Sequence, residues 1–261
     1  MNNQRNFACM LIHTSSINHI GVIHFQNEEI NLLSVDFINM LNHALDAMEQ
    51  DDSVHVIVLA SDKKAFCLGA NLNELLHLAE TRKISNLDDL HDPIEDWQRL
   101  ASVEKPVIVC VKGACLGGGL EMVLMCDFIV ASEQATFGFP EIKLGLLPGG
   151  GGTQRILDRI SAGRAREMIM IGDSVAAETA FNWGLIDVVF AHDECFDGAL
   201  NLASKLASCS LDSLKAIKKL LIMNNVERIK QGLVMERAAF YERLESPKAV
   251  ERINAFLDRK K

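Results

Sequence analysis

The stretch that decides the fold and points to the chemistry reads Pro106-Val-Ile-Val-Cys-Val111, Lys112-Gly-Ala-Cys-Leu116, Gly117-Gly-Gly119 and Leu120-Glu121. Its apolar, β-branched start is typical of a buried strand. The glycines let the backbone approach a ligand closely, and the helix that follows has unpaired N–H groups in its first turn. A carboxylate inside an apolar helix is costly unless it has a partner or a chemical role. The stretch therefore predicts an anion-stabilising backbone beside Glu121 as an acid or base.

The first 190 residues alternate short β-like runs with amphipathic helices, which predicts an α/β fold. The predicted strands are residues 20–25, 54–59, 107–111, 128–131 and 186–190. Ser34 is suited to cap a helix whose apolar positions run from Val35 to Met48. Residues 83–93 are polar and predict a loop that leads into a helix around Trp97.

The pattern changes after His192. Residues 196–223 and 225–258 have helical spacing throughout, with a break predicted at Asn224-Asn225 and a last helix that starts at Ser246-Pro247. We therefore divide the chain into a core of residues 1–195 and a helical region of residues 196–261. Such a helical tail has no compact core of its own, so it is expected to pack on a neighbour in the same chain or in another subunit.

Composition excludes several classes of function. The net charge of −9 over 261 residues argues against a nucleic-acid-binding face. No apolar stretch approaches the 18 or so residues of a membrane span, and the N-terminus lacks the apolar segment of a secretory signal. The seven cysteines are irregularly spaced and form no CxxC pair, which indicates reduced thiols. The expected location is a bacterial cytoplasm or a comparable reducing compartment.

A second glycine turn, Phe66-Cys-Leu-Gly-Ala-Asn-Leu72, follows the strand predicted near residues 54–60. A lone glycine after a strand is usually only a turn. Here, however, the strand at residues 107–111 also ends in a glycine turn. Two such turns at one edge of a sheet can aim two N–H groups at a single oxygen, which is the arrangement of an oxyanion hole.

The third element is Ala135-Thr-Phe-Gly-Phe-Pro140-Glu141. Apolar neighbours would raise the pKa of Glu141, as a general acid requires, although a surface glutamate in a loop is the simpler interpretation of this residue alone. The four glycines at 149–152 lack the Gly-Lys-Ser/Thr ending of a phosphate-binding loop. Cys67 and Cys115 flank the glycine turns, but no histidine lies nearby in a recognisable pair, and there is no Gly-x-Ser-x-Gly motif of a serine hydrolase.

Taken together, these residues resemble the crotonase (enoyl-CoA hydratase/isomerase) superfamily, and the resemblance covers nearly the whole chain. The motifs that carry it are Ala65-Phe-x-x-Gly-Ala70, Gly113-Ala-x-Leu-Gly-Gly-Gly-x-Glu121, Cys126-Asp127, Phe137-Gly-x-Pro-Glu141, Leu144-Gly-Leu-Leu-Pro-Gly-x-Gly-Gly-Thr-Gln-Arg155, Gly172-Asp-x-Val-x-Ala-x-x-Ala180 and Trp183-Gly-Leu-Ile-Asp187.

The resemblance implies a spiral core of ββα units and a helical C-terminal region that builds homotrimers, often paired as hexamers. It implies an acyl-CoA substrate, with coenzyme A as part of that substrate and no metal or other cofactor. Ala70 and Gly118 occupy the positions that supply the two oxyanion N–H groups in the family. Glu121 and Glu141 are the counterparts of its two catalytic glutamates, and we take Glu121 as the water-activating group and Glu141 as the proton donor to Cα, with the reverse assignment left open.

The resemblance also implies a set of residues that contact the substrate. They are Glu29, Ile30, Leu68, Gly69, Leu72, Gly117, Pro140, Gly149, Phe256 and Arg259. Some residues depart from the family pattern: Asn71 stands where Asp is usual, and Asn73 where Lys is common. Glu28 and Glu29 lie in a segment that is often basic, and acidic side chains there would weaken binding of the CoA phosphates.

The leading hypothesis is an enoyl-CoA hydratase that adds water to a 2-enoyl-CoA thioester and gives the 3-hydroxyacyl-CoA. An enoyl-CoA isomerase or a dehydratase of a specialised acyl-CoA on the same fold is the first alternative. A non-catalytic acyl-CoA-binding relative is the second, because the departures at Glu28, Glu29, Asn71 and Asn73 are compatible with a weakened CoA site.

Overall fold

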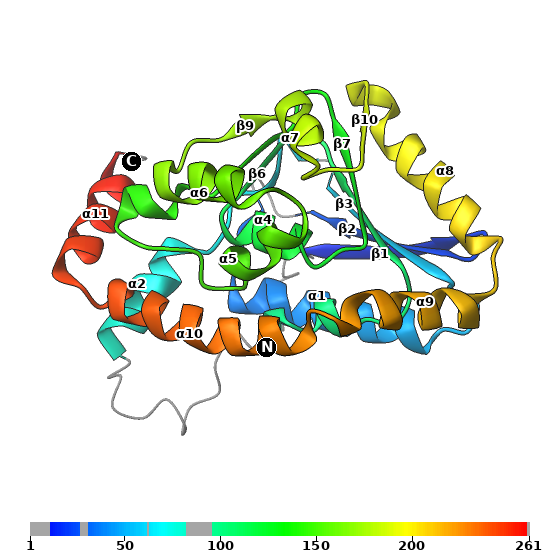
Figure 1. Ribbon diagram of the computed structural model, residues 1–261, viewed down its shortest axis with the longest axis horizontal. Coiled ribbons are helices and arrows are strands. Elements are labelled where there is room, and N and C mark those ends of the chain that lie inside the picture. The colour runs from blue at the N-terminus through cyan, green and yellow to red at the C-terminus, as the bar shows by residue number, and fades with distance from the viewer. Residues whose placement is uncertain (1–10, 27–30, 62, 82–95, 260–261) are drawn as a thin grey trace, which may run out of the picture.

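The computed structural model describes residues 11–26, 31–61, 63–81 and 96–259, and these form an α/β fold with two sheets (Figure 1). The larger sheet has the strand order β1-β2-β3-β5-β7-β10, and the smaller one β4-β6-β8-β9. The strands are β1 (Ile12–Ile17), β2 (Ile20–Phe25), β3 (Val56–Ser61), β4 (Ala65–Cys67), β5 (Val107–Val111), β6 (Ala114–Leu116), β7 (Phe128–Ser132), β8 (Thr136–Gly138), β9 (Val175–Ala176) and β10 (Val188–Phe190).

The helices surround both sheets. The α-helices are α1 (Val35–Gln50), α2 (Leu72–Thr81), α4 (Gly118–Val123), α5 (Gly152–Arg155), α6 (Ala162–Ile171), α7 (Ala177–Trp183), α8 (Cys195–Ala207), α9 (Leu211–Met223), α10 (Val226–Leu244) and α11 (Pro247–Asp258). Short 3₁₀ helices are η2 (Leu100–Ser102), η3 (Pro140–Leu144), η4 (Ile156–Asp158) and η5 (His192–Glu194). None of the helices in the described part of the chain combines the length and apolar character needed to cross a bilayer.

The chain winds as a spiral in which successive turns add one strand to each sheet. β3, β5 and β7 pair in parallel in the larger sheet, and β4, β6 and β8 pair in parallel in the smaller one. A helix follows each strand of the smaller sheet, which gives the repeated ββα unit. Because parallel neighbours end at the same edge of a sheet, the turns after β4, β6 and β8 meet there. The predicted spiral of ββα units is confirmed.

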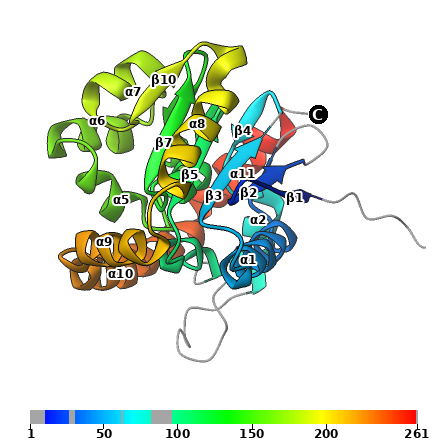
Figure 2. The same ribbon diagram turned by 90° about the vertical axis from the view of Figure 1, so that its right-hand side faces the viewer.

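The central strands of the larger sheet are buried on both faces, which explains their unbroken apolar sequence. In β3, Ile57 and Leu59 face the core shared with α1, whereas Val56 and Val58 face the cluster under α8. Figure 2 shows α8 lying across the outer face of β5 and β7. The division drawn between residues 195 and 196 falls at the first residues of this helix, so the region assigned to the tail begins with a helix that covers the core sheet.

Several predicted boundaries agree with the structure. The strands predicted at residues 20–25 and 107–111 have those bounds, and Ser34 caps α1 by accepting a hydrogen bond from the N–H of Phe37. The break at residues 224–225 is confirmed, and so is the start of α11 at Ser246-Pro247, where the serine accepts from the N–H of Ala249.

Other predictions were wrong in detail. Residues 196–223 are two helices, because α8 ends at Ala207 and Ser210 caps α9. β3 and β10 each begin two residues later than predicted. β1 was missed because Ile12–Ile17 is an edge strand with mostly polar, exposed residues, and its hairpin to β2 passes through Asn18 and His19 in the left-handed region.

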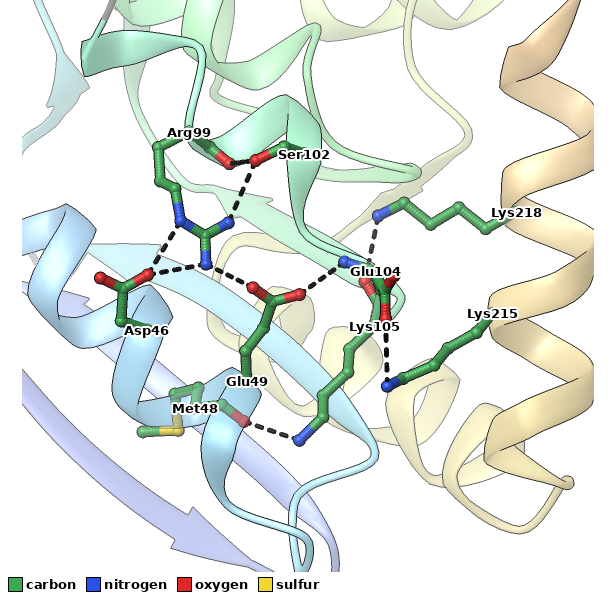
Figure 3. Close-up of polar contacts among 9 residues, drawn as sticks. All are labelled: Asp46, Met48, Glu49, Arg99, Ser102, Glu104, Lys105, Lys215 and Lys218. Carbon is green, nitrogen blue, oxygen red and sulfur yellow. Dashed lines mark hydrogen bonds and ion pairs between the residues drawn. The ribbon is translucent and has the colours of Figure 1, made fainter.

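The end of α1 is held by a buried cation. Lys105 is 2% exposed, and its Nζ donates to the carbonyls of Met48 and Asp51, both at 2.8 Å. Arg99 pairs with Asp46 and Glu49 of α1, while the other oxygen of Glu49 accepts from the N–H of Glu104 (Figure 3). These contacts fix residues 99–105 on α1 just after Trp97.

Replacing Lys105 by methionine is expected to lower the free energy of unfolding by about 2 kcal/mol, since two carbonyls at the end of α1 lose a charged donor. Urea unfolding measures the change. The matched control is Lys215→Met, which removes an exposed ion pair to Glu104 and is expected to change stability by less than about 0.5 kcal/mol. Equal effects of the two substitutions would contradict the assigned role of Lys105.

Candidate active site

The turns after β4 and β6 pack against each other. Gly69 has a φ of 91°, and a methyl group added there would lie 3.1 Å from the carbonyl oxygen of Leu116 and 3.2 Å from the nitrogen of Gly118. The carbonyl of Gly69 accepts from the N–H of Leu33, and the N–H of Asn71 donates to the carbonyl of Leu33. The sequence thus brings together the two glycine turns that the motifs predicted.

The backbone N–H groups of these turns are available as donors. The bridge to Leu33 uses groups on either side of Ala70, so the N–H of Ala70 faces away from that strand. Gly118 is the first residue of α4, where an N–H has no acceptor within the helix. Within the described ranges, no hydrogen bond uses the N–H of either residue.

Glu121 is buried one turn into α4, with 3% of its surface exposed. Its Oε1 accepts from the N–H of Gly150 at 2.7 Å and from the N–H of Gly152 at 2.8 Å. Burial raises the pKa of Glu121 well above its ordinary value, and the charges of Glu236 and Glu141 raise it further. The two N–H donors act in the opposite direction, because they favour the ionised form.

Glu141 comes from η3, which Pro140 opens directly after β8. Its Oε1 lies 2.8 Å from the position of a methyl group added at Gly117, so its carboxyl rests on the glycine turn. Its Oε2 is buried and accepts no hydrogen bond from the described residues. Burial raises the pKa of Glu141 to about 7, with a further contribution from the charge of Glu236. The interpretation of Glu141 as a surface glutamate is therefore wrong.

A third buried carboxylate completes the cluster. Glu236 of α10 is 4% exposed and accepts from the N–H of Gly151 at 2.5 Å and from the N–H of Thr153 at 2.9 Å. The hydroxyl of Thr153 also donates to it. Sequence reasoning missed Glu236, because it lies in the helical tail, 83 positions or more from its partners. The only signal was the expectation that the tail packs on a neighbour.

One buried cation accompanies the three carboxyl groups. Arg155 is 8% exposed, and its guanidinium donates to the side-chain oxygen of Gln98 at 2.6 Å and to the carbonyl of Gly150 at 3.5 Å. The charges of Glu121 and Glu236 both act on Arg155, and they oppose the effect of burial, which lowers its pKa. Among the described residues, no group of histidine, cysteine, aspartate and glutamate side chains has the arrangement of a metal site.

Trp97 forms a wall beside the glycine turns. Methyl groups added at Gly118 and Gly150 would lie 2.9 Å and 2.8 Å from its ring. The same ring borders a small cavity lined by apolar side chains and one asparagine, which are Leu33, Ile38, Leu41, Asn42, Leu100, Met122 and Met125. Trp97, around which a helix was predicted, thus lies at the site, and residues 96–97 are helical, whereas the whole of the predicted loop at residues 83–93 falls outside the described residues.

Of the two asparagines that depart from the family pattern, Asn71 has a structural role through its side chain. The side-chain oxygen of Asn71 accepts from the N–H of Asn73 at 3.1 Å, and its amide donates to Glu74 at 3.3 Å. The other oxygen of Glu74 accepts from the N–H of Val35 at 3.0 Å. These contacts cap α2 and tie the turn after β4 to the start of α1.

The remaining residues that were predicted to contact the substrate are spread over several elements of the fold. Leu68 belongs to the first glycine turn, and Leu72 starts α2, where it packs on the cluster formed by α10 and α11. A methyl group added at Gly149 would collide with the ring of Phe240. Phe256 and Arg259 are exposed at the end of α11, which packs on α2 and η3. Glu28, Glu29 and Ile30 lie outside the described residues.

Comparison with known proteins decides the family. A sequence profile of the enoyl-CoA hydratase/isomerase family matches residues 16–261. The chain belongs to this family.

Relatives within the enoyl-CoA hydratase/isomerase family align with this chain over most of their length. A 2,3-dehydroadipyl-CoA hydratase of Escherichia coli (strain K12) is 37% identical over 88% of this chain and 88% of its own. A probable enoyl-CoA hydratase of Rhizobium meliloti (strain 1021) is 34% identical over 98% of this chain and 97% of its own. The crystal structure of an enoyl-CoA hydratase/isomerase from Pseudoalteromonas atlantica T6c is 25% identical and superposes with a TM-score of 0.85, covering 95% and 97% of the two chains.

Proposed function

We propose that this protein is an enoyl-CoA hydratase, a lyase that adds water across the double bond of a 2-enoyl-CoA thioester. The observation that supports it most directly is a pair of carboxyl groups beside the two glycine turns that carry free N–H donors. Glu121 is buried, and Glu141 has a buried Oε2. The names of its relatives in the family support the same activity.

In the proposed reaction the thioester oxygen accepts from the N–H groups of Ala70 and Gly118. Attack of water on Cβ places negative charge on that oxygen as the enolate forms. Donors fixed by the backbone stabilise this charge without rearranging, and each is worth about 10²–10³ in rate. The first turn of α4 adds the positive end of its peptide dipoles.

The two glutamates divide the proton transfers. Glu121 accepts two N–H hydrogen bonds, which favour its ionised form and oppose the rise of its pKa on burial, so we assign it the role of taking a proton from the attacking water. Glu141 has no such donors on Oε2, and its raised pKa makes it suited to deliver a proton to Cα. The hydroxyl of the water ends on Cβ and a proton ends on Cα. A proton then passes from Glu121 to Glu141, which restores the starting state of the two glutamates.

The test of the activity is the loss of the ultraviolet absorbance of the conjugated thioester, with mass spectrometry of the product. Hydration adds the mass of one water, whereas isomerisation leaves the mass unchanged. A panel of 2-enoyl and 3-enoyl thioesters, with 2,3-dehydroadipyl-CoA among them, distinguishes the hydratase from the isomerase and dehydratase alternatives. Acyl-CoA binding without turnover, measured by calorimetry, would indicate the non-catalytic alternative.

The pH dependence of hydration follows from Glu141. Because its pKa is raised to about 7 and it donates a proton, kcat/KM is expected to fall as pH rises through about 7. A pH–rate profile from pH 5 to 9 measures this fall. A profile that stays flat up to pH 9 would contradict Glu141 as the proton donor.

We further propose that the protein forms homotrimers, either alone or paired as hexamers. Large apolar side chains are exposed along α9 and α10, namely Ile217, Leu220, Leu221, Ile222, Met223, Val234 and Met235. Exposed apolar side chains in such number on neighbouring helices are typical of a protein interface. Light scattering coupled to size-exclusion chromatography tests the assembly. Leu221→Glu is expected to shift it toward smaller species, whereas Lys248→Glu, at an exposed position of α11, is expected to leave it unchanged.

The proposed reaction needs no metal or redox cofactor, because coenzyme A arrives as part of the substrate and the charge develops on an oxygen that backbone donors hold. We also propose a reducing compartment such as the cytoplasm. None of the six cysteines in the described residues is in a disulfide, and five of them are buried.

A further inference from the structure

We propose that Glu236 is a positioning residue of this active site, which holds the loop of residues 150–153 so that two of its N–H groups stay aimed at Glu121. The inference rests on the proposed hydration, since it assigns Glu236 a role in that reaction. Glu236 does not touch the reacting atoms and acts through the loop and through its charge.

The backbone N–H groups of residues 150–153 donate alternately to Glu121 and to Glu236. The N–H groups of Gly150 and Gly152 donate to Glu121, and those of Gly151 and Thr153 donate to Glu236. The loop therefore runs between two buried carboxylates, one from α4 and one from α10. Its glycines are required by space, because methyl groups at Gly150 and Gly152 would lie 3.1 Å and 3.0 Å from the oxygens of Glu121.

The alternating hydrogen bonds link the position of Glu121 to that of Glu236 through the loop. Each N–H that donates to Glu121 belongs to a residue bonded directly to one that donates to Glu236. The loop cannot rotate away from Glu236 without changing the direction of the N–H groups of Gly150 and Gly152. Gly151 has a φ of 111°, which glycine adopts readily and other residues rarely adopt, so the path of the loop requires a glycine there.

The charges around Glu236 give it a second effect on the same reaction. Glu121 faces it from α4, Glu141 from η3 and Arg155 from α5. The single guanidinium of Arg155 cannot balance three carboxylates. Burial raises the pKa of Glu236 itself, and in its ionised form Glu236 favours the protonated form of Glu141, which is the form that donates a proton.

The experiment compares Glu236→Gln with Glu236→Asp in the full-length protein. Glutamine keeps the length but removes the charge, and its amide faces one of the loop N–H donors. We expect kcat for hydration to fall by about 10- to 100-fold with KM changed less than about 3-fold, and the basic limb of the pH profile to move about one unit lower. Aspartate keeps the charge but is one methylene too short to reach both donors, so kcat falls while the basic limb stays in place.

The matched control is Glu242→Gln, the same change at an exposed position of the same helix, which is expected to leave kcat and the pH profile unchanged. Hydrogen exchange at residues 150–153 provides a measurement that does not depend on turnover. Faster exchange in Glu236→Gln than in the control supports the positioning role. Should the glutamine variant fail to fold, Thr153→Val removes the hydroxyl donor to Glu236 and is expected to give a smaller loss of kcat.

The outcomes separate the two proposals. If the wild-type protein hydrates no 2-enoyl thioester but loop exchange rises in Glu236→Gln, the proposed function fails, and so does the catalytic part of the inference, while the anchoring of the loop stands. If the wild type is active and Glu236→Gln matches the Glu242→Gln control in kcat, pH profile and exchange, the positioning role of Glu236 is overturned and the proposed function stands.

Discussion

Glu121→Gln and Glu141→Gln are each expected to lower kcat for hydration by about 10³-fold, because each removes one partner of a two-proton transfer. Both side chains sit at the glycine turns, with Glu121 held by two N–H donors and Glu141 resting on Gly117. Glutamine preserves the size of each group but can neither take a proton from water nor deliver one to carbon. KM is expected to change much less than kcat, since neither carboxyl is needed to hold coenzyme A.

The double variant is expected to be at most about 10-fold slower than either single variant, because the two groups act as a unit on one water molecule.

Thermal stability provides the control for misfolding of these variants. The pKa of Glu141 is raised in the folded state, so its contribution to stability is present below its unfolded value of 4.5 and is lost as pH rises through about 7. Glu141→Gln is therefore expected to unfold at a temperature at least as high as the wild type at pH 8. Full activity in both single variants would exclude the two-glutamate mechanism.

Local sequence predicted the parts of the site that depend on short-range geometry. The turn after β6 needs glycine because Gly117 has a φ of 54° and the carboxyl of Glu141 occupies the space of a side chain. The turn after β4 needs glycine for the same reasons, because Gly69 also has a positive φ and little space for a side chain. Their meeting was predictable because parallel strands end at a common edge. The strand and helix that carry these turns were predictable from apolar periodicity.

Long-range contacts were not predictable in this way. Glu236 lies on a helix whose neighbouring residues Val234 and Met235 are exposed, so periodicity alone places it on no particular surface. Its burial depends on α10 crossing the loop of residues 150–153, which is a tertiary contact. The same limit applies to the asparagines: Asn71 differs from the family pattern, and only the structure shows that its side chain caps α2.

Gly117→Ala is expected to lower kcat by about 10²–10³-fold, comparable to the loss of an oxyanion donor. Gly117 has φ 54° and ψ −129°, a conformation open to glycine and costly for any residue with a Cβ. The added methyl group would also lie 2.8 Å from Oε1 of Glu141. The substitution therefore rotates the N–H of Gly118 and displaces a catalytic carboxyl at the same time.

The matched control for Gly117→Ala is Gly163→Ala in α6, where φ is ordinary and the nearest atom to the added methyl group is 3.9 Å away. There alanine is expected to leave kcat unchanged and to stabilise the helix by about 0.5–1 kcal/mol. Steady-state kinetics with a 2-enoyl thioester and thermal unfolding measure both variants. The methyl group added at residue 117 would contact the carboxyl of Glu141. Adding the substitution Glu141→Asp to Gly117→Ala is therefore expected to relieve this contact, because aspartate is shorter, but not the backbone strain at residue 117. Unchanged kcat in Gly117→Ala would show that neither the direction of the Gly118 N–H nor the place of Glu141 limits hydration.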